Sequence, residues 1–364
     1  MILAPTPSPP RTAPPSRGIV SGARRKPWLA ATGLALLGLL PARLAWACAG
    51  CRNPNLPITR VSTAQISPGQ VRASAVLSAT SVNVVHEAGC SDPTTCRDLP
   101  VQPPFLHDQD IRPAELRAVV ELGLTRHLGA ELQAPFRVTQ TRIRYSDLEG
   151  RAYEPLDPGV HHRNETLSGL GDPWLLGRIG GRFAGTAVTA RLGTTIPLGK
   201  TESDPFALGA RGLSHQHIQF GTGTFNPLAV IDLSRGFGRF DVSGYGQAEL
   251  SLYDNKHGFR AGHRFATGVL GGMVVYPRLT AALGVDVLSE RPERWGGRVQ
   301  QDGNLGRTDV LGGVTLTRSF GATIASLTAR FPFYRHIVEG DEPTGRLSSP
   351  LTMSIVVTRT FGAP

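Results

Sequence analysis

Lysine and long apolar runs are both scarce in this chain of 364 residues. After residue 47, lysine occurs only at Lys200 and Lys256, and the arginines are scattered among acidic and apolar residues. Because nucleic-acid-binding proteins cluster their basic residues on one face, we predict no nucleic-acid partner. Beyond the N-terminal region, no segment approaches the roughly 18 consecutive apolar residues of a transmembrane helix. A helical membrane anchor is therefore excluded.

Familiar catalytic motifs are missing as well. No G-x-S-x-G, H-E-x-x-H, P-loop or dinucleotide fingerprint occurs in a supporting context. Residues 214–217, Ser-His-Gln-His, place a serine beside histidine as a lipid-hydrolysing barrel enzyme would need, but they do not resemble that family's nucleophile motif. We therefore predict that the protein is not an enzyme and holds no cofactor.

The net charge of +10 comes mainly from the N-terminus. Six of the 38 basic residues precede residue 48, where there is no acidic residue, which leaves 32 basic against 28 acidic residues in the remainder. Arg24-Arg25-Lys26, an apolar stretch at 28–40 and Ala45-Trp46-Ala47 have the order of a signal peptide with an A-x-A cleavage site. We predict that residues 1–47 are cleaved after export. Acylation of Cys48, as in a lipoprotein, is the alternative.

Export would place all four cysteines in an oxidising compartment. Cys90 and Cys96 flank a turn-rich stretch and are predicted to form a small disulfide loop. Cys48 and Cys51 have C-x-x-C spacing and form either a terminal disulfide or a copper or zinc ligand pair. Arg52 follows where haem attachment would need histidine, so haem is excluded there. We assign residues 48–68 to a short periplasmic segment.

From residue 70 onward the sequence alternates with period two. In residues 239–253 the even positions are apolar and most odd positions are polar or charged. The same alternation occurs in residues 115–122, 279–287 and 351–358. The 43 glycines and 29 prolines add many turns. Amphipathic strands of about ten residues are therefore predicted, typical of strands that line a membrane barrel.

The links between these strands alternate in length. Short links at 126–129, 236–238, 276–278 and 319–321 alternate with long polar links at 86–113, 146–169, 199–223, 254–261, 290–306 and 336–347. Outer-membrane barrels have short periplasmic turns and long external loops, whereas a soluble sandwich, the alternative, has no reason for this order. We predict an all-β fold at 69–364: a transmembrane barrel of about twelve antiparallel strands, from near Val71 to Phe361, in the bacterial outer membrane.

Aromatic residues lie near the predicted strand ends, as interfacial girdles would require. Those near the long links are Tyr145, Trp174, Tyr253, Phe265, Phe331 and Phe333, and those near the short links are Phe183, Phe240, Tyr276, Phe320 and Phe361.

Three short motifs carry a family resemblance. Residues 169–172 (GLGD), 196–200 (IPLGK) and 221–223 (GTG) resemble those of the MetA-type outer-membrane transporters of the phenol meta-pathway. That resemblance implies a barrel that moves small, often aromatic or hydrophobic, compounds. The last strand, ending at Thr360-Phe361, also resembles the C-terminal aromatic signature of outer-membrane proteins, although Gly362-Ala363-Pro364 follows.

The polar strand faces should line the barrel interior, since charge is excluded from the lipid side. The predicted lining residues are Arg72, Glu115, Arg117, Glu121, Glu131, Arg137, Arg191, Asp241, Glu249, Asp286 and Arg330. The arginines would favour anionic or aromatic solutes, unless the glutamates neutralise them. His215 and His217 are weak candidates for a metal site, and no metal is predicted.

We therefore interpret the chain as an outer-membrane channel or transporter whose partners are membrane lipid and a small-molecule solute. The alternatives are a structural or partner-binding barrel with a plugged lumen and, less favoured, a metal-binding or lipid-active barrel. The sequence leaves the oligomeric state open.

Overall fold

A computed structural model describes residues 66–90, 101–156, 163–300, 303–339, 345–348 and 351–362. The predicted signal peptide, the segment at 48–68 up to residue 65, and Cys48, Cys51 and Cys96 lie outside the described residues. Cys90 ends a strand, but its side chain is not among those described. The two disulfides therefore stay predictions.

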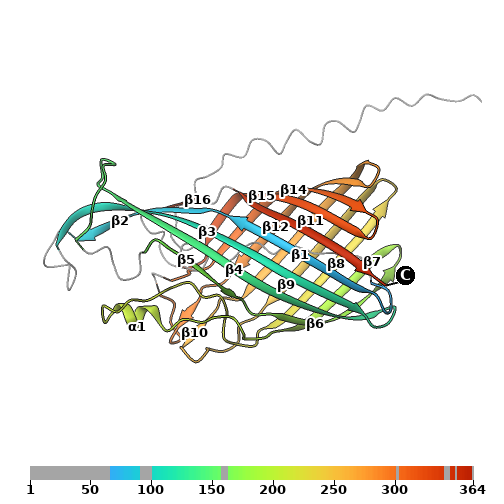
Figure 1. The fold of residues 1–364 in the computed structure, drawn as a ribbon, viewed down its shortest axis with the longest axis horizontal. Helices are drawn as coiled ribbons and strands as arrows, with labels where there is room; N and C mark the ends of the chain where they lie inside the picture. The colour runs from blue at the N-terminus through green and yellow to red at the C-terminus, as the bar shows by residue number, and fades with distance from the viewer. Residues whose placement is uncertain are drawn as a thin grey trace, which may run out of the picture. The chain divides into compact units, whose positions relative to one another are not determined.

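Twelve antiparallel strands form a closed barrel (Figure 1). They are β1 (Val71–Thr80), β3 (Gln102–Gly123), β4 (Leu128–Ser146), β6 (Trp174–Phe183), β7 (Thr186–Thr195), β8 (Pro227–Phe237), β9 (Phe240–Glu249), β11 (Arg264–Tyr276), β12 (Leu279–Glu290), β14 (Arg307–Phe320), β15 (Thr323–Ile337) and β17 (Thr352–Phe361). β1 closes the barrel because it pairs with β17 on one side and with β3 on the other. The predicted fold class and strand number are confirmed.

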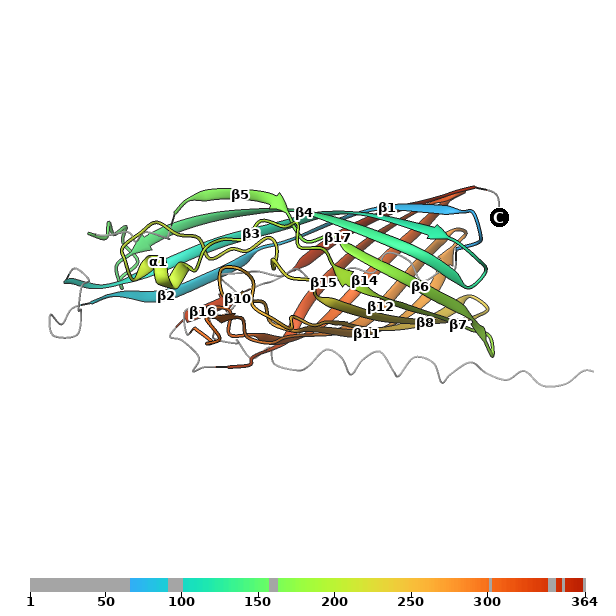
Figure 2. The ribbon, with the colours of Figure 1, turned by 90° about the horizontal axis from the view of Figure 1, so that it is seen from below.

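Several shorter elements lie at one end of the barrel. β2 (Val82–Cys90) and β16 (Gly345–Ser348) extend the sheet beside β3, and β5 (Glu165–Leu170) pairs with residues 136–141 of β4. β10 (Phe259–Arg260) and β13 (Arg294–Trp295) form a small separate ladder, and α1 (Pro205–Gly209) is a single short helix. Figure 2 shows β2, β5 and α1 at the end opposite the C-terminus. No helix among the described residues is long and apolar enough to cross a membrane.

The strands have an apolar outer face and a polar inner face. In β17, Met353, Ile355 and Val357 are exposed, whereas the side chains between them are buried. Leu283 and Val269 are likewise more than half exposed on the outer wall. A water-soluble protein rarely presents so large a continuous apolar surface, whereas a lipid-facing barrel wall requires one.

The outward side chains change from apolar to charged in the half of β3 that lies farther from its C-terminal end. Between Pro113 and Phe105 the outward positions become charged, with Asp110 bound to Arg112. The buried positions there are mixed: Ile111 packs against Val82 and Val84, whereas His107 and Gln109 are polar. The apolar outer band therefore ends near Arg112. The prediction of a long loop at 86–113 was wrong, because β2 and β3 pair from Val82 opposite Ile111 to Cys90 opposite Gln102.

All the short turns lie at the end of the barrel where the chain has its C-terminus, which we call the short-turn end. They occupy residues 124–127, 184–185, 238–239, 277–278 and 321–322. Gly185, Gly238 and Gly321 have φ angles of 82°, 65° and 63°, which a two-residue hairpin turn requires and glycine adopts without strain. The predicted alternation of short and long links is confirmed, although the turn at 184–185 was not predicted.

The aromatic girdle is confirmed at the short-turn end, where all five predicted residues are exposed. At the other end Tyr253, Phe265, Phe331 and Phe333 are exposed as expected. The prediction was wrong for Trp174, which is buried on the inner face, and for Tyr145, whose ring stacks on His107 inside the upper sheet. Aromatic rings occur on the inner faces of both strands. A position near a strand end therefore does not show whether a ring faces the lipid or the interior.

The lipid-facing wall can be tested at mid-height. Val285 is exposed and pairs with Val269 and Gly312, so Val285→Arg should destabilise the barrel by about 2–4 kcal/mol. Leu128→Arg, at the exposed rim of β4, should cost only about 0–1 kcal/mol because the guanidinium reaches the interface. Urea unfolding in lipid vesicles measures both. Equal tolerance of the two substitutions would contradict a membrane-spanning wall.

Candidate functional site in the barrel lumen

The predicted lining residues project from the inner faces of seven strands. Those that are buried are Arg72, Glu115, Arg117, Glu121, Glu131, Arg191, Glu249, Asp286 and Arg330, and those that are partly buried are Arg137 and Asp241. Buried charges are costly unless each is paired and hydrogen-bonded. The pairing of these side chains therefore determines what the lumen can do.

The layer nearest the short turns is built from ion pairs. Arg72 donates two hydrogen bonds of 2.6 Å to the Glu121 carboxylate, which also lies 3.5 Å from Arg178. Arg191 bridges two carboxylates, Glu131 at 3.2 Å and Asp232. The three arginines and three acids of this layer balance in charge.

The middle layer centres on Glu115. Its carboxylate accepts hydrogen bonds from Arg117 at 2.5 and 2.9 Å and from Arg137 at 2.8 Å, so one acid is shared by two guanidinium groups. The Arg117 guanidinium also lies 4.6 Å from the centre of the Trp174 ring. An arginine stacked on an aromatic ring in this way can also stack on an aromatic solute.

A separate buried pair lies on the opposite wall. Arg330 donates to one oxygen of Asp286 at 2.8 Å, and the Tyr245 hydroxyl donates to the other at 2.9 Å. The Arg330 and Asp286 side chains are 6% and 5% exposed, so neither charge has bulk water as an alternative partner.

The link between β7 and β8, residues 196–226, enters this interior. Asp172, between β5 and β6, accepts hydrogen bonds from the backbone N–H of Gly199 at 2.9 Å and of Thr222 at 2.6 Å, and from the Thr222 hydroxyl at 2.8 Å. Gly199 and Gly221 cross so closely that a Cβ on either would lie 2.6 Å from the other's Cα. Only glycine permits this crossing. The three motifs that carry the family resemblance thus meet at one point.

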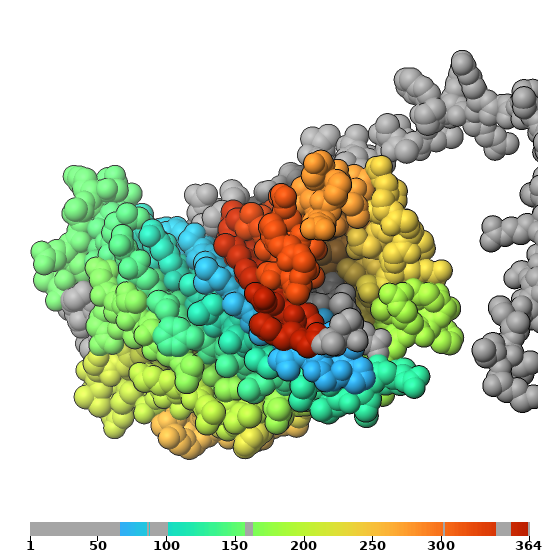
Figure 3. Space-filling view, turned by 45° about the vertical axis from the view of Figure 1, so that its right-hand side comes forward, coloured from blue at the N-terminus to red at the C-terminus, as the bar shows by residue number. Residues whose placement is uncertain are grey.

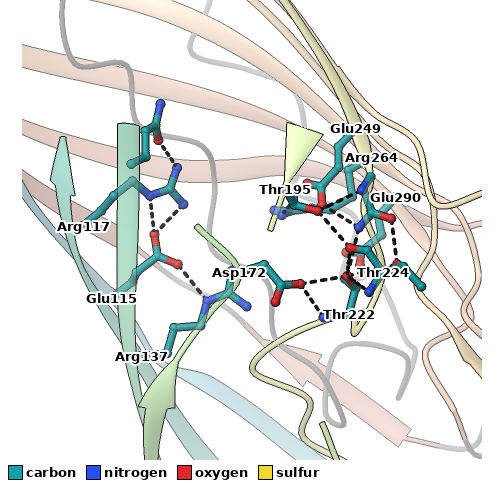
Figure 4. A network of polar contacts seen from close by, with 12 residues as sticks. Glu115, Arg117, Arg137, Asp172, Thr195, Thr222, Thr224, Glu249, Arg264 and Glu290 are labelled. Atoms are coloured by element: carbon teal, nitrogen blue, oxygen red, sulfur yellow. Dashed lines mark hydrogen bonds and ion pairs between the residues drawn. The ribbon is translucent and has the colours of Figure 1, made fainter. Parts of the chain in front are cut away.

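Residues 219–222 of this link lie inside the barrel and contact residues on two sides of it. The Phe220 carbonyl accepts a hydrogen bond of 3.2 Å from Arg137, and the Thr222 carbonyl accepts one of 3.0 Å from Asn255. Figure 4 shows Asp172 between the Glu115 cluster on one side and Thr222 with Glu249 and Arg264 on the other. We call residues 219–222, held by Asp172, the inward segment.

The inward segment and the walls enclose a polar cavity of about 40 Å³. Its lining includes Arg137, Trp174, Glu249, Arg264 and Glu290. A cavity of this size holds a few water molecules and no aromatic ring. In this conformation the inward segment therefore occupies space that a solute would need at this level.

The two candidate metal ligands lie outside the barrel wall network, near α1. The rings of His215 and His217 are 5.1 Å apart, and the Phe206 ring lies 5.2 Å from His217. Among the residues that the structure describes, no group of three or more His, Cys, Asp or Glu side chains could hold a metal ion. The metal hypothesis stays an untested alternative.

Several interior residues were missed by the sequence analysis. Arg178 and Asp232 continue the alternation of β6 and β8, so the period-two signal could have identified them. Asp172, Gly199 and Gly221 lie in links, where no periodicity operates. The motif resemblance was the only signal that pointed to them.

Comparison with known proteins identifies a fold. No family model matches the chain, and no curated protein matches it. A solved structure, the COG4313 outer membrane channel from Pseudomonas putida F1, superposes with a TM-score of 0.53 at 14% identity, over 84% of this chain and 100% of that one. The fold is therefore that of an outer-membrane barrel.

Two further solved structures are less similar. A Pseudomonas aeruginosa FadL homologue matches with a TM-score of 0.38 and 10% identity over 80% of this chain and 90% of that one. The P. putida toluene transporter TodX matches with a TM-score of 0.38 and 9% identity over 81% and 90%.

The Asp286–Arg330 pair tests whether interior charges are mutually dependent. Asp286→Asn should destabilise the barrel by about 3–5 kcal/mol, since it leaves the buried Arg330 charge uncompensated. Replacing both residues, Asp286→Leu with Arg330→Met, should recover most of the loss. Urea midpoints in lipid vesicles measure each variant, and Asp147→Asn, at the exposed pair with Arg151, is the control that should change little. A double variant as unstable as the single would contradict this account.

Proposed function

We propose that this protein is a channel for small molecules in the outer membrane of a Gram-negative bacterium, reached by export through the predicted signal peptide. One observation carries the proposal: the closed wall is apolar outside, while its interior holds arginines and carboxylates from most of its strands. A structural barrel could pack apolar side chains in its core instead. The fold likeness to an outer-membrane channel supports the same function.

We further propose small polar aromatic compounds as the preferred solute. The interior charges are nearly balanced, because each of Arg117, Arg137, Arg191 and Arg330 binds a carboxylate. A balanced interior discriminates weakly between ions, whereas stacked guanidinium groups and the Trp174 ring offer surfaces to a planar solute. Membership of the MetA-type family implies this substrate class, and the meeting of its three motifs at Asp172 supports that membership.

The inward segment would act as the constriction. Its position depends on the two hydrogen bonds from Thr222 to Asp172, on the Phe220 and Gly221 N–H groups that donate to the Lys200 carbonyl at 3.2 and 3.0 Å, and on the contact with Arg137. Residues 219–222 take part in no strand ladder. The strands themselves are fixed by continuous ladders. Passage of a solute would therefore require movement of residues 219–222 and not of the wall.

Single-channel recording in a planar bilayer tests both statements. The native barrel should conduct, and Asp172→Ala should give larger or longer openings, because Thr222 of the inward segment loses two hydrogen bonds to Asp172 and Gly199, which crosses the segment, loses a third. Asp147→Ala, which removes a carboxylate from an external turn, is the matched control and should behave as native. Unchanged conductance in Asp172→Ala and in a variant that also carries Arg137→Ala would refute the constriction, because the second variant removes the Arg137 contact with the Phe220 carbonyl as well.

The small cavity also favours a second candidate, a plugged barrel that serves as a structural or partner-binding protein. The two candidates differ in one measurement. Absence of current from the native barrel and from Asp172→Ala, with both folded by heat-modifiable electrophoretic mobility, would favour the plugged barrel and reject the channel.

Ion selectivity tests the charge balance. Arg137→Ala should shift the reversal potential in a salt gradient toward cation preference, because Glu115 then balances Arg117 alone while Asp172, Glu249 and Glu290 face only Arg264. Arg142→Ala, on the outward face of the same strand, is the control and should leave the potential unchanged. A native barrel with strong cation preference would contradict a balanced lumen.

A further inference from the structure

The short-turn end of the barrel carries arginines without acids. No Asp or Glu occurs in residues 124–127, 182–186, 234–240, 275–280, 318–323 or 359–362. Besides Arg126, six arginines of these segments are exposed: Arg182, Arg235, Arg239, Arg278, Arg318 and Arg359. Within the part of the chain that the structure describes, none of the six forms an ion pair. Their charge is therefore uncompensated by the protein.

Four of these guanidinium groups lie over the aromatic girdle. The distances to ring centres are 5.2 Å for Arg235 on Phe237, 5.3 Å for Arg239 on Phe240, 5.4 Å for Arg318 on Phe320 and 5.3 Å for Arg359 on Phe361. We call these four arginines the arginine belt. Each of the phenylalanines is about half exposed.

The belt faces outward and not into the lumen. In a strand, side chains two residues apart share a face, so Arg235, Arg318 and Arg359 lie on the same face as their phenylalanines. That face is the apolar outer wall, where Ile355 and Val357 are exposed above Arg359. Figure 3 turns this end toward the viewer and shows the turn segments standing at its rim. The belt thus surrounds the wall where the apolar band ends.

At the opposite end of the barrel, ion pairs with carboxylates are common. Several basic residues there bind carboxylates: Arg112 to Asp110 at 2.5 Å, Arg144 to Asp108 at 3.1 Å, Arg151 to Asp147 at 2.6 Å, Lys200 to Glu202 at 2.7 Å and Arg260 to Asp254 at 2.6 Å. Others, such as the exposed Arg142, Arg211 and Arg294, form no ion pair among the described residues. The belt is distinguished by segments that contain no acid and by a phenylalanine ring against each guanidinium group, so the protein does not supply its anions.

We propose that the arginine belt binds the phosphate groups of phospholipids in the membrane leaflet at the short-turn end, with a preference for anionic phospholipid. The Phe ring lies against the acyl chains, and the guanidinium above it meets phosphate at the height of the headgroups. Arginine suits this ligand because its planar fork donates two hydrogen bonds to phosphate oxygens. The inference rests on the membrane placement proposed above.

Native mass spectrometry of the barrel extracted from vesicles tests the proposal. The vesicles contain phosphatidylcholine with a minority of phosphatidylglycerol, and the ratio of the two lipids retained on the protein is measured. The native barrel should be enriched in phosphatidylglycerol, and the variant Arg235→Gln, Arg318→Gln, Arg359→Gln should lose about fivefold of that enrichment for each arginine removed. High salt should reduce the native enrichment as well.

The matched control removes three arginines from the opposite end, Arg112→Gln, Arg144→Gln and Arg151→Gln, and should keep the native enrichment. If the glutamine variant of the belt does not fold, Arg→Lys at the same positions keeps the charge, removes the fork and should give an intermediate enrichment. Equal lipid ratios on the native barrel and the belt variants, or no preference in the native barrel, would overturn the lipid inference alone. Failure of the native barrel to insert into vesicles of either composition would overturn the membrane placement and the inference with it.

Discussion

Backbone hydrogen bonding is the constraint on which this structure depends. In lipid an unpaired N–H or C=O has no water to bind, so a sheet that spans the membrane must have no free edge. β1 meets this requirement by pairing Val71 with Phe361 of the last strand and with Leu122 of β3. Closure then leaves each side chain of a strand only two environments, lipid or lumen. Charged side chains are stable only in the second, and the alternation along every strand follows from that choice.

Collecting the charges inside creates a second requirement, because each buried ion must find a partner. Glu121 between Arg72 and Arg178, and Arg191 between Glu131 and Asp232, satisfy it by joining neighbouring strands and strands that are one strand apart. Such bridges tie the wall together at the level of the side chains, as the ladders do at the level of the backbone. A lumen built this way has a rigid wall, so any adjustable passage must depend on segments outside the ladders. The inward segment is such an element, since side chains and the carbonyl of Lys200 hold it and strand pairing does not.

The sequence predicted those parts of the molecule that a period of two can encode. Glu121, Arg191 and Asp286 were identified because an amphipathic strand places every second residue on one face. The same reasoning failed for the upper half of β3, where Asp108 and Asp110 were interpreted as loop residues. There the strand leaves the lipid and charged side chains take the outward positions, while the same alternate residues stay buried. The apolar side chains therefore no longer mark the outward face. Asp172 was beyond this method, because its partners Gly199 and Thr222 come from a separate link and only the folded chain brings them together.

The change from apolar to charged outward side chains near Arg112 and the arginine belt together set the height of the barrel in the membrane. Along β3, the outward face is apolar between the charged Arg112 and Leu122, and the ten residue steps between these two residues span about 33 Å of strand. At a tilt of about 40° this corresponds to a height of about 25 Å, which is the height of the lipid-facing band of outer-membrane barrels. Shifting the barrel toward the short-turn side would draw Arg112 and Asp110 into hydrocarbon, and shifting it the other way would bury Arg318 and Arg359. Both displacements cost desolvation of charge, so the charges at the two rims confine the apolar band to one depth.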